Sequence, residues 1–344
     1  MSFQKTINDI KDGNIPTNLN RLKRRLWPNY CYHFTNIDNA IQILQAGYLY
    51  SRKRAISLGI MRNENANQDI IANTQPKVFD YARLYFRPQA PTLFDNEGFR
   101  AQKAYKHARC PFPIYFLFSL SDVLNLPTSY FSSVSLATHQ KPVFLSSETD
   151  FSELPFNLIY NDSRFTRAER DNIVRHEQAE IIVKSQLSLS YLQKIVVRSV
   201  AEKDTLDQLL KNAGLTNFLD QIEIDEDGSF FFKRWTYMDD VTMNSDNIKL
   251  SMRVGQDAFP TDWGNSPRAI VPESHELYLN YRVVIIDSNN REWYWPNPAK
   301  VNALPQNLTL SLKNINDDNY TVKVYLDGQL AYFGRHDEFS DLPF

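Results

Sequence analysis

The spacing of apolar residues changes at about residue 220, and this change constrains the fold more than any other feature of the sequence. Beyond it, segments such as 277–283 and 320–325 alternate apolar and polar side chains, as half-buried strands do. About seven strand-like segments in roughly 110 residues are typical of a β-sandwich, immunoglobulin-like in outline. We expect these strands at 230–232, 250–254, 276–286, 292–295, 308–312, 320–326 and 329–333, with hairpin turns at 289–290 and 327–328.

Before residue 220 the patterns of helices and strands are mixed, which predicts an α+β domain. The clearest element is a helix over 36–46, because its apolar residues recur at helical spacing and Gly47 is placed to end it. The other expected elements are strands at 48–51, 114–120, 131–133, 143–145, 180–183 and 195–200, a short helix from Ser121 and a helix over 201–212.

Two irregular regions complete the first domain. Pro88 and Pro91 cannot donate to a strand ladder, so we expect a rigid extended turn after the strand that begins near residue 78. Residues 157–178 are polar and are expected to form a long loop. The predicted domains are therefore residues 1–218, with an α+β fold, and residues 219–344, an acidic β-sandwich.

The composition limits the class of protein. With 42% of its 344 residues hydrophobic, the chain can bury a sizeable core, but it has no apolar run of about 18 residues to cross a membrane. The N-terminus lacks the layout of a secretory signal, and Cys31 and Cys110 are expected to be reduced thiols. We therefore expect a cytoplasmic protein with no membrane partner.

The two predicted domains differ in charge. Residues 1–215 carry 27 basic and 20 acidic side chains, whereas residues 216–344 carry 11 and 20. A basic half suits a polyanionic partner such as nucleic acid, and an acidic half repels one. The alternative is that both halves are ordinary solvated surfaces. The basic cluster Arg21, Lys23, Arg24 and Arg25 is either a nucleic-acid arm or the outer face of a short helix.

Several common active-site motifs are missing from the sequence. The histidines and cysteines show no metal-ligand spacing, so we expect no metal site. The chain has no GxGxxG, GxxxxGK[ST] or GxSxG motif, which argues against a Rossmann site, a P-loop and a hydrolase nucleophile elbow.

The segment from Arg175 to Val183 places a carboxylate, Glu180, at the mouth of an apolar strand. A buried carboxylate is costly unless it is paired or solvated. Glu180 is therefore either a strand-end group paired with a loop arginine or a functional residue. The loop before it carries Arg164, Arg167 and Arg170, which would suit a substrate-reading surface.

Two upstream groups of residues are candidates for ligand binding. His33 and Thr35 alternate along a predicted strand, so both face one side, where His33 would donate to a ribose hydroxyl. Tyr81, Tyr85 and Phe86 would stack on nicotinamide or on a flipped base. The alternatives are a structural histidine and ordinary core aromatics, and we favour the core for Phe86 taken alone.

Four blocks in this order resemble the DarT group of DNA ADP-ribosyltransferase toxins. The blocks are Tyr32-His33-Phe34-Thr35 to Gly47, Asp80-Tyr81 to Leu93, Phe118-Ser119-Leu120 to Ser133, and Arg175 to Val183, over roughly residues 30–200. The resemblance implies an ADP-ribosyltransferase fold and NAD as substrate, without a metal. The β-rich residues 220–344 lie outside it.

The resemblance also implies roles for individual residues. Glu180 would be catalytic, with Arg175 beside it, and NAD would be held by His33, Thr35 and Asn39. The nicotinamide pocket would be lined by Tyr81, Tyr85 and Phe86, and nucleic acid would meet Arg87, Gln89, Arg164, Arg167, Arg170 and His176. The chain departs from the family in having Arg87-Pro88-Gln89 in place of Asn-Pro-Arg and in lacking an arginine at 70–75.

These observations lead to the hypothesis that the chain transfers ADP-ribose from NAD to a base of single-stranded nucleic acid, with DNA favoured. By analogy with the family it would be a toxin of a toxin–antitoxin or antiphage system, restrained by an antitoxin. The alternatives are messenger RNA as the acceptor, a protein ADP-ribosyltransferase and a non-catalytic binding module.

The acidic sandwich has three possible uses: docking an antitoxin or another partner, sensing a phage, or shielding the basic half. Exposed side chains among Trp293, Tyr294 and Trp295 would suit a partner contact, although we expect at least one of them to pack inside.

Overall fold

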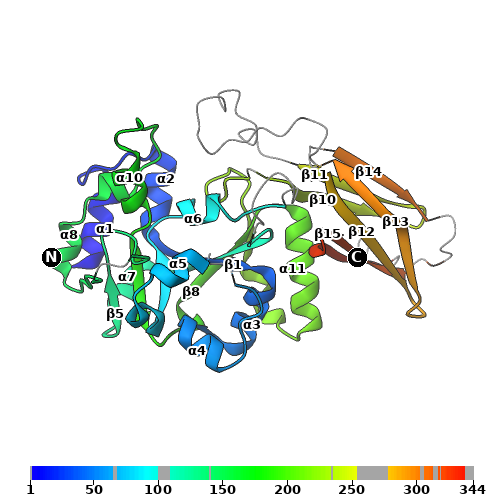
Figure 1. Cartoon of the computed structure of the whole chain (residues 1–344), viewed down its shortest axis with the longest axis horizontal. Coiled ribbons are helices and arrows are strands. Elements are labelled where there is room, and N and C mark those ends of the chain that lie inside the picture. The colour runs from blue at the N-terminus through cyan, green and yellow to red at the C-terminus, as the bar shows by residue number, and fades with distance from the viewer. Residues whose placement is uncertain are drawn as a thin grey trace. The chain divides into compact units, whose positions relative to one another are not determined.

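The chain forms two compact units in the computed structural model (Figure 1). Unit 1 comprises Met1–Asp95 and Ile114–Val196, and unit 2 comprises Asn96–Pro113 and Val197–Phe344. The structure describes residues 2–64, 68–99, 109–138, 141–233, 235–253, 278–302, 306–312, 317 and 319–337.

Unit 1 is a mixed α/β body built on one sheet. Strands β5, β6, β3, β1, β4 and β8 lie in that order, and β2 pairs with β7 separately. The elements are α1 (Phe3–Asp12), α2 (Arg21–Leu26), η1 (Trp27–Asn29), β1 (Tyr30–Asn36), α3 (Ile37–Ala46), β2 (Tyr48–Tyr50), α4 (Arg52–Ser57), α5 (Gln68–Asn73), η2 (Pro76–Asp80), β3 (Tyr81–Tyr85), α6 (Pro91–Phe94), β4 (Pro113–Ser119), α7 (Leu120–Leu124), β5 (Ser129–Phe131), α8 (Glu148–Ser152), α9 (Phe156–Ile159), α10 (Arg170–Glu177), β6 (Glu180–Lys184), β7 (Gln186–Ser188), η3 (Leu189–Tyr191) and β8 (Leu192–Val197).

The helix expected after the first strand is confirmed as α3. It ends at Gly47, whose φ of 73° is a left-handed conformation that glycine adopts without strain. The N–H of Gly47 donates to the carbonyl of Ile43 at 3.0 Å and closes the last turn. β1 and α3 together therefore fix the first of the four family-like blocks.

Strand β3 lies between β1 and β6 and brings distant parts of the sequence together. Tyr85 pairs with Tyr32 of β1 on one side and with Glu180 of β6 on the other. Because side chains alternate between the faces of a strand, Tyr81, Arg83 and Tyr85 share one face of the sheet.

Three sequence predictions for unit 1 are wrong in detail. Residues 157–178 are not one long loop, because they contain the end of α9 and all of α10. Residues 143–145 form no strand and contribute an isolated bridge between Leu145 and Phe131. Pro91 does not extend the turn but begins α6, where its missing N–H costs nothing because the first helical turn has no acceptor for it.

Unit 2 contains one long helix followed by strands. Its elements are α11 (Val200–Asn212), η4 (Thr216–Gln221), β9 (Ile222–Ile224), β10 (Tyr237–Met243), β11 (Asn247–Arg253), β12 (Tyr278–Asp287), β13 (Glu292–Asn302), β14 (Gln306–Ser311), β15 (Asn319–Leu326) and β16 (Gln329–Asp337). β10, β11 and β14 form one antiparallel sheet, and β13, β12, β15 and β16 form a second. Met238, Leu250 and Leu310 of the first sheet share a core with Val283 and Val322 of the second, which confirms the expected all-β sandwich.

The strand order gives this sandwich its immunoglobulin-like outline. With β10 to β16 lettered A to G, the sheets are A-B-E and D-C-F-G. Immunoglobulin constant domains use ABED and CFG, so here the fourth strand has joined the other sheet. The hairpin predicted at 327–328 is present between β15 and β16, with positive φ at both Asp327 and Gly328.

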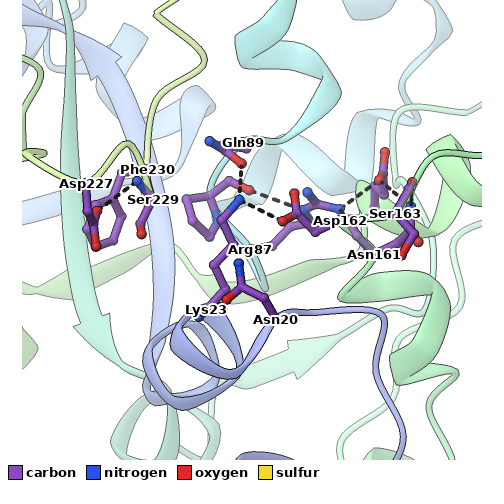
Figure 2. Close-up of polar contacts among 12 residues, drawn as sticks. Asn20, Lys23, Arg87, Gln89, Asn161, Asp162, Ser163, Asp227, Ser229 and Phe230 are labelled. Atoms are coloured by element: carbon purple, nitrogen blue, oxygen red, sulfur yellow. Dashed lines mark hydrogen bonds and ion pairs between the residues drawn. The ribbon is translucent and has the colours of Figure 1, made fainter.

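Other predictions for unit 2 need correction. Residues 230–232 form no strand, because the Asp225 carboxylate accepts the backbone N–H groups of Phe230 and Phe231 at 3.2 and 3.1 Å. Figure 2 shows the neighbouring turn, in which Asp227 accepts from the Ser229 N–H at 3.0 Å. Strand β10 was not predicted, and the expected start of a strand at 276–277 lies outside the described residues.

The aromatic residues of β13 are exposed where the structure describes them. Trp293 is 37% exposed and Tyr294 is 55% exposed. The side chain of Trp295 lies outside the described residues. Cys31 and Cys110 are both buried free thiols, as expected.

Candidate active site

A cavity of about 240 Å³ opens on one face of the unit 1 sheet. Five of the residues predicted to bind NAD line it: His33, Thr35, Asn39, Tyr81 and Tyr85. They come from β1, α3 and β3, so the sheet and the helix packed on it assemble the site. Arg83 of β3 and Arg52 of α4 lie in the same lining and add cationic side chains.

Phe86 is placed differently from the prediction. Its side chain is fully buried and packs against Phe151, with ring centroids 6.1 Å apart, and against Phe131 at 6.5 Å. It follows Tyr85 in the chain, so its side chain points to the opposite side from the cavity-lining residues. Phe86 therefore belongs to the core, as its sequence context alone suggested.

Glu180 lies at the start of β6, and its side chain is 1% exposed. Its Oε2 accepts from Nε of Arg83 at 2.5 Å, and its Oε1 accepts from Nη2 of Arg83 at 2.7 Å. Oε1 also accepts from the backbone N–H of Leu136 at 2.8 Å. A carboxylate offers about four lone-pair sites, so these three bonds leave one acceptor site on Oε2.

Arg83 is one of the lining residues that the sequence analysis did not assign to the site, together with Arg52 and Phe34. Arg83 faces Ile182 across the ladder, which makes Glu180 its diagonal neighbour on the same face. Burial lowers the pKa of the Arg83 guanidinium, but the charge of Glu180 outweighs this and the pKa is raised overall. In the sequence, Arg83 alternates with Tyr81 and Tyr85, so the three side chains share one face of the strand. This alternation was the available sign that Arg83 faces the cavity.

His33 is tied to the same strand by its ring. Its Nδ1 lies 3.0 Å from the carbonyl oxygen of Arg83. Burial lowers the pKa of His33 to about 4, so the ring is neutral near pH 7. A carbonyl can only accept, so Nδ1 carries the proton and Nε2 is an acceptor. The ring nitrogen that remains for a ligand is therefore an acceptor, whereas the sequence analysis expected a donor.

Asn39 shapes the cavity wall through its side-chain amide. Its Oδ1 accepts from the backbone N–H groups of Arg62 and Asn63, both at 2.9 Å, and its Nδ2 donates to the Asn63 carbonyl at 2.8 Å. Asn39 thus holds the segment after α4 against α3. Arg52 and Glu64 form an ion pair in the same wall.

The two tyrosines have different surroundings. Tyr81 makes edge contacts with Tyr130 and Phe144, with ring centroids 6.0 and 5.1 Å away. Tyr85 stacks on Phe34 at 6.0 Å with the rings 13° from parallel. Burial raises the pKa of Tyr85, and the charge of Glu180 raises it further, so the phenol stays neutral. The Phe34–Tyr85 pair gives the cavity a flat aromatic wall that suits nicotinamide or a base.

Arg87 is not placed to meet nucleic acid as predicted. Its side chain is 4% exposed, and its Nη1 donates to Oε1 of Glu177 at 2.8 Å and to the Asn161 carbonyl. Its guanidinium also lies over the Trp27 ring, 5.0 Å from the centroid. A buried charge is costly unless it is paired, so the Arg87 guanidinium must keep its contact with Glu177. Arg87 therefore cannot turn outwards to contact nucleic acid.

Gln89 lies beside this buried group and is also engaged within the protein. Its backbone N–H donates to the Tyr115 hydroxyl at 3.2 Å, and its Oε1 accepts from Nζ of Lys23 at 3.4 Å. Lys23 in turn pairs with Asp162 at 2.8 Å (Figure 2). Arg87 and Gln89 therefore anchor the turn after β3.

The remaining predicted nucleic-acid residues lie on or near the surface. Arg164, Arg167, Arg170 and Arg175 are exposed. His176 is half-buried, and its Nδ1 lies 2.7 Å from the Ser133 carbonyl. Arg175 is on α10, and its side chain makes no bond to Glu180, so the structure does not bring the two together as a catalytic pair in the described residues.

The described residues contain neither a metal-binding cluster nor a membrane-spanning helix. Across the described ranges, no cluster of His, Cys, Asp and Glu side chains is arranged to hold a metal ion. In the same part of the chain, no helix is both long and apolar enough to cross a membrane.

Glu180 does not itself line the cavity, but its ion-pair partner Arg83 does, so the carboxylate lies behind the cavity wall. A model of the DarT family, described as ssDNA thymidine ADP-ribosyltransferase, matches residues 32–232. The match covers more than half of the chain, which belongs to the DarT family and is an NAD-dependent ADP-ribosyltransferase acting on nucleic acid. The cavity's acceptor histidine, hydroxyl group, cationic side chains and aromatic wall fit NAD as the substrate.

Solved structures of the same family are similar in part. Thermus sp. 2.9 DarT in complex with ADP-ribosylated ssDNA is 20% identical, with a TM-score of 0.47, over 60% of this chain and 97% of that chain. The same protein in complex with NAD+ has a TM-score of 0.45 at 20% identity, over 60% and 98% of the two chains. Thermosipho africanus DarTG in complex with ADP-ribose is 18% identical, with a TM-score of 0.43, over 56% and 51%. No curated protein matches the chain.

Proposed function

We propose that this protein transfers ADP-ribose from NAD to the thymine of a thymidine in single-stranded DNA. The observation that carries the proposal is the Glu180 carboxylate, held by Nε and Nη2 of Arg83, which lines a cavity that fits NAD. The choice of thymidine and of DNA follows the description of the matching family.

Different site residues bind different parts of NAD. Nε2 of His33 accepts from a ribose hydroxyl, and the wall of Phe34 and Tyr85 packs against the nicotinamide ring. Arg52, which is also paired with Glu64, donates to the diphosphate, and Asn39 keeps that side of the cavity in shape. Thr35 lines the same pocket and offers a hydroxyl.

Glu180 stabilises the reacting sugar. As the bond between the ribose and nicotinamide breaks with its electron pair leaving on nicotinamide, positive charge develops on the ribose. The free acceptor site on Oε2 takes the ribose 2'-hydroxyl, and the carboxylate stabilises the charge electrostatically. Arg83 acts through Glu180: its two hydrogen bonds fix the orientation of the carboxylate.

The acceptor is a thymine ring nitrogen. In thymidine, N1 is bonded to the sugar, so N3 is the nitrogen that attacks C1' of the ribose; as the N3–C1' bond forms, the N3 proton passes to water. A base in duplex DNA is stacked and paired, and exposing it costs a few kcal/mol, which favours a single strand. ADP-ribose on N3 would block base pairing, so such an enzyme would act as a toxin and require an antitoxin to restrain it.

The test is labelling by radioactive NAD of single-stranded DNA, duplex DNA, RNA and total protein, each incubated separately with the purified chain. DNA with thymidine replaced by deoxycytidine identifies the base. We expect label only on thymidine-containing single-stranded DNA, and none with Glu180→Gln. Glu226→Gln, at an exposed carboxylate, is the matched control and should label normally. Label on RNA or protein instead would replace the proposed acceptor, and no label with any acceptor would overturn the proposal.

A further inference from the structure

Helix α2 and the segment before α10 lie side by side on unit 1. Asn18 donates its backbone N–H to the Tyr160 carbonyl at 3.1 Å, and Asp162 returns one to the Asn18 carbonyl at 3.2 Å. The Lys23–Asp162 ion pair is a further contact between the two segments (Figure 2). Exposed side chains of the two segments therefore lie on neighbouring parts of the unit 1 surface.

This surface is rich in arginines that the active site does not use. We call it the basic track and define it as the exposed residues Arg21, Arg25, Arg164, Arg167, Arg170 and Arg175. Residues 163–176 carry four arginines but also two carboxylates, so on their own they are only weakly basic. The sequence has no Asp or Glu from residue 13 to residue 37, so α2 adds positive charge that nothing nearby in sequence offsets.

The basic track leads to the active site. α10 ends at Glu177, and in the next residue Oε1 of Gln178 accepts from Oγ1 of Thr92 at 3.5 Å. Thr92 lines the cavity, and Glu180 follows two residues after Gln178. A single strand of DNA whose target base enters the cavity can thus continue along α10 towards α2.

We propose that the basic track binds the phosphates of single-stranded DNA beyond the target nucleotide, with Arg21 and Arg25 of α2 as its outer contacts. Phe165, which is 38% exposed between Arg164 and Arg167, offers a ring on which a base stacks. The inference rests on the proposed function and extends it. α2 precedes residues 32–232, so its contacts add to those of the family domain.

The test compares DNA of two lengths. Fluorescence anisotropy measures the binding of single-stranded DNA of about 6 and about 24 nucleotides to wild-type protein and to Arg21→Glu/Arg25→Glu. Lys211→Glu/Lys249→Glu, at two exposed lysines of unit 2, changes the net charge equally and is the control. NAD binding is measured by calorimetry for all three proteins.

The α2 variant should bind the long DNA about tenfold more weakly, with a salt dependence shallower by about 1.4 in slope for two lost phosphate contacts. Its affinity for the short DNA and for NAD should stay at the wild-type value, and the control should match wild type throughout. The proposal would be overturned if the variant and the control lost affinity for the long DNA equally, or if the variant kept the wild-type affinity for it. Failure of the proposed function looks different: the wild-type protein would bind the long DNA in the length-dependent way but label neither DNA.

Discussion

Two arginine–glutamate pairs lie close together in unit 1 and have opposite surroundings. Arg83 and Glu180 meet at the cavity wall, where the arginine side chain is 28% exposed and the glutamate 1%. Arg87 and Glu177 lie four and three residues away along the same two segments, and their side chains are 4% and 10% exposed. The charge of Glu180 raises the pKa of Arg83, whereas burial lowers that of Arg87 despite Glu177.

Because of these surroundings, the same kind of ion pair has a different role at each position. The Arg87–Glu177 pair is sealed by Trp27 and the Asn161 carbonyl, so it fixes the end of α10 and the turn after β3. In the Arg83–Glu180 pair, Arg83 lines the cavity and Oε2 of Glu180 keeps a spare acceptor site, which is why we assign the proposed chemistry to this pair. Buried pairs contribute little net stability but are costly to break, which makes the first pair a structural fastening.

The largest expected effect separates the two glutamates. Glu180→Gln should lower the labelling rate about 10²- to 10⁴-fold, because the amide keeps the shape and removes the charge that stabilises the reacting sugar. Glu177→Gln should leave the rate per folded molecule within about tenfold. Single-turnover labelling with circular dichroism of each variant makes the comparison. Similar rate losses in two folded variants would contradict the division of roles.

The next effect is on the free energy of unfolding, which should differ between variants of Arg87 and of Arg83. Arg87→Ala leaves Glu177 buried without its cation and should lower the free energy of unfolding by about 3–5 kcal/mol. Arg83→Ala should cost less, since Glu180 keeps the Leu136 N–H and water can enter from the cavity. Urea unfolding measures both, and an equal loss of stability would show that the two pairs are energetically alike.

A smaller effect tests how Arg83 orients Glu180. Arg83→Lys keeps the positive charge but cannot make two parallel hydrogen bonds to the carboxylate. We expect kcat to fall about tenfold with KM for NAD nearly unchanged, because Arg83 acts on the carboxylate rather than on bound NAD. Steady-state kinetics over a range of NAD concentrations decides this. A rise in KM with unchanged kcat would instead make Arg83 a contact of NAD.

The smallest effect is on the pH dependence of stability. It involves His33, whose ring is hydrogen-bonded to the carbonyl of Arg83. The pKa of His33 is about 4 in the folded protein and about 6.5 in an unfolded chain. The unfolded state therefore binds the proton first, and stability present above pH 6.5 is lost as the pH falls towards 4. Thermal unfolding of wild type and His33→Gln at pH 7 and pH 5 measures this. Wild type should lose more stability than the variant between these values, and parallel losses would mean that His33 titrates normally.

Features encoded in short stretches of sequence could be predicted. α3 follows from helical spacing and Gly47, β6 from an apolar run after Glu180, and the sandwich from alternation. α10 was missed because it is polar on almost every side and buries only Ile173 and Glu177. Its stabilising contact, Arg87, comes from a segment about 90 residues earlier.

The pairing of Arg83 with Glu180 could not be predicted for a related reason. The two residues meet only because β3 and β6 are neighbours in a register that sets Arg83 diagonal to Glu180. Strand neighbours and register depend on the whole sheet, and a shift by one residue would turn Arg83 to the other face. Likewise, the position of Arg87 between two aromatic residues and a proline-containing turn gave no sign that Trp27 and Glu177 enclose its side chain.

The helix α11 has a consequence for how this protein can be divided. It lies within the family match, yet it belongs to the same compact unit as the appended sheets. Thr205 of α11 accepts from the Phe333 N–H of β16 at 3.0 Å, and Ala201 is part of the sandwich core. A fragment that stops at residue 232 would leave that face of the helix in water. A boundary for dividing the chain therefore falls before α11 rather than at the end of the family match.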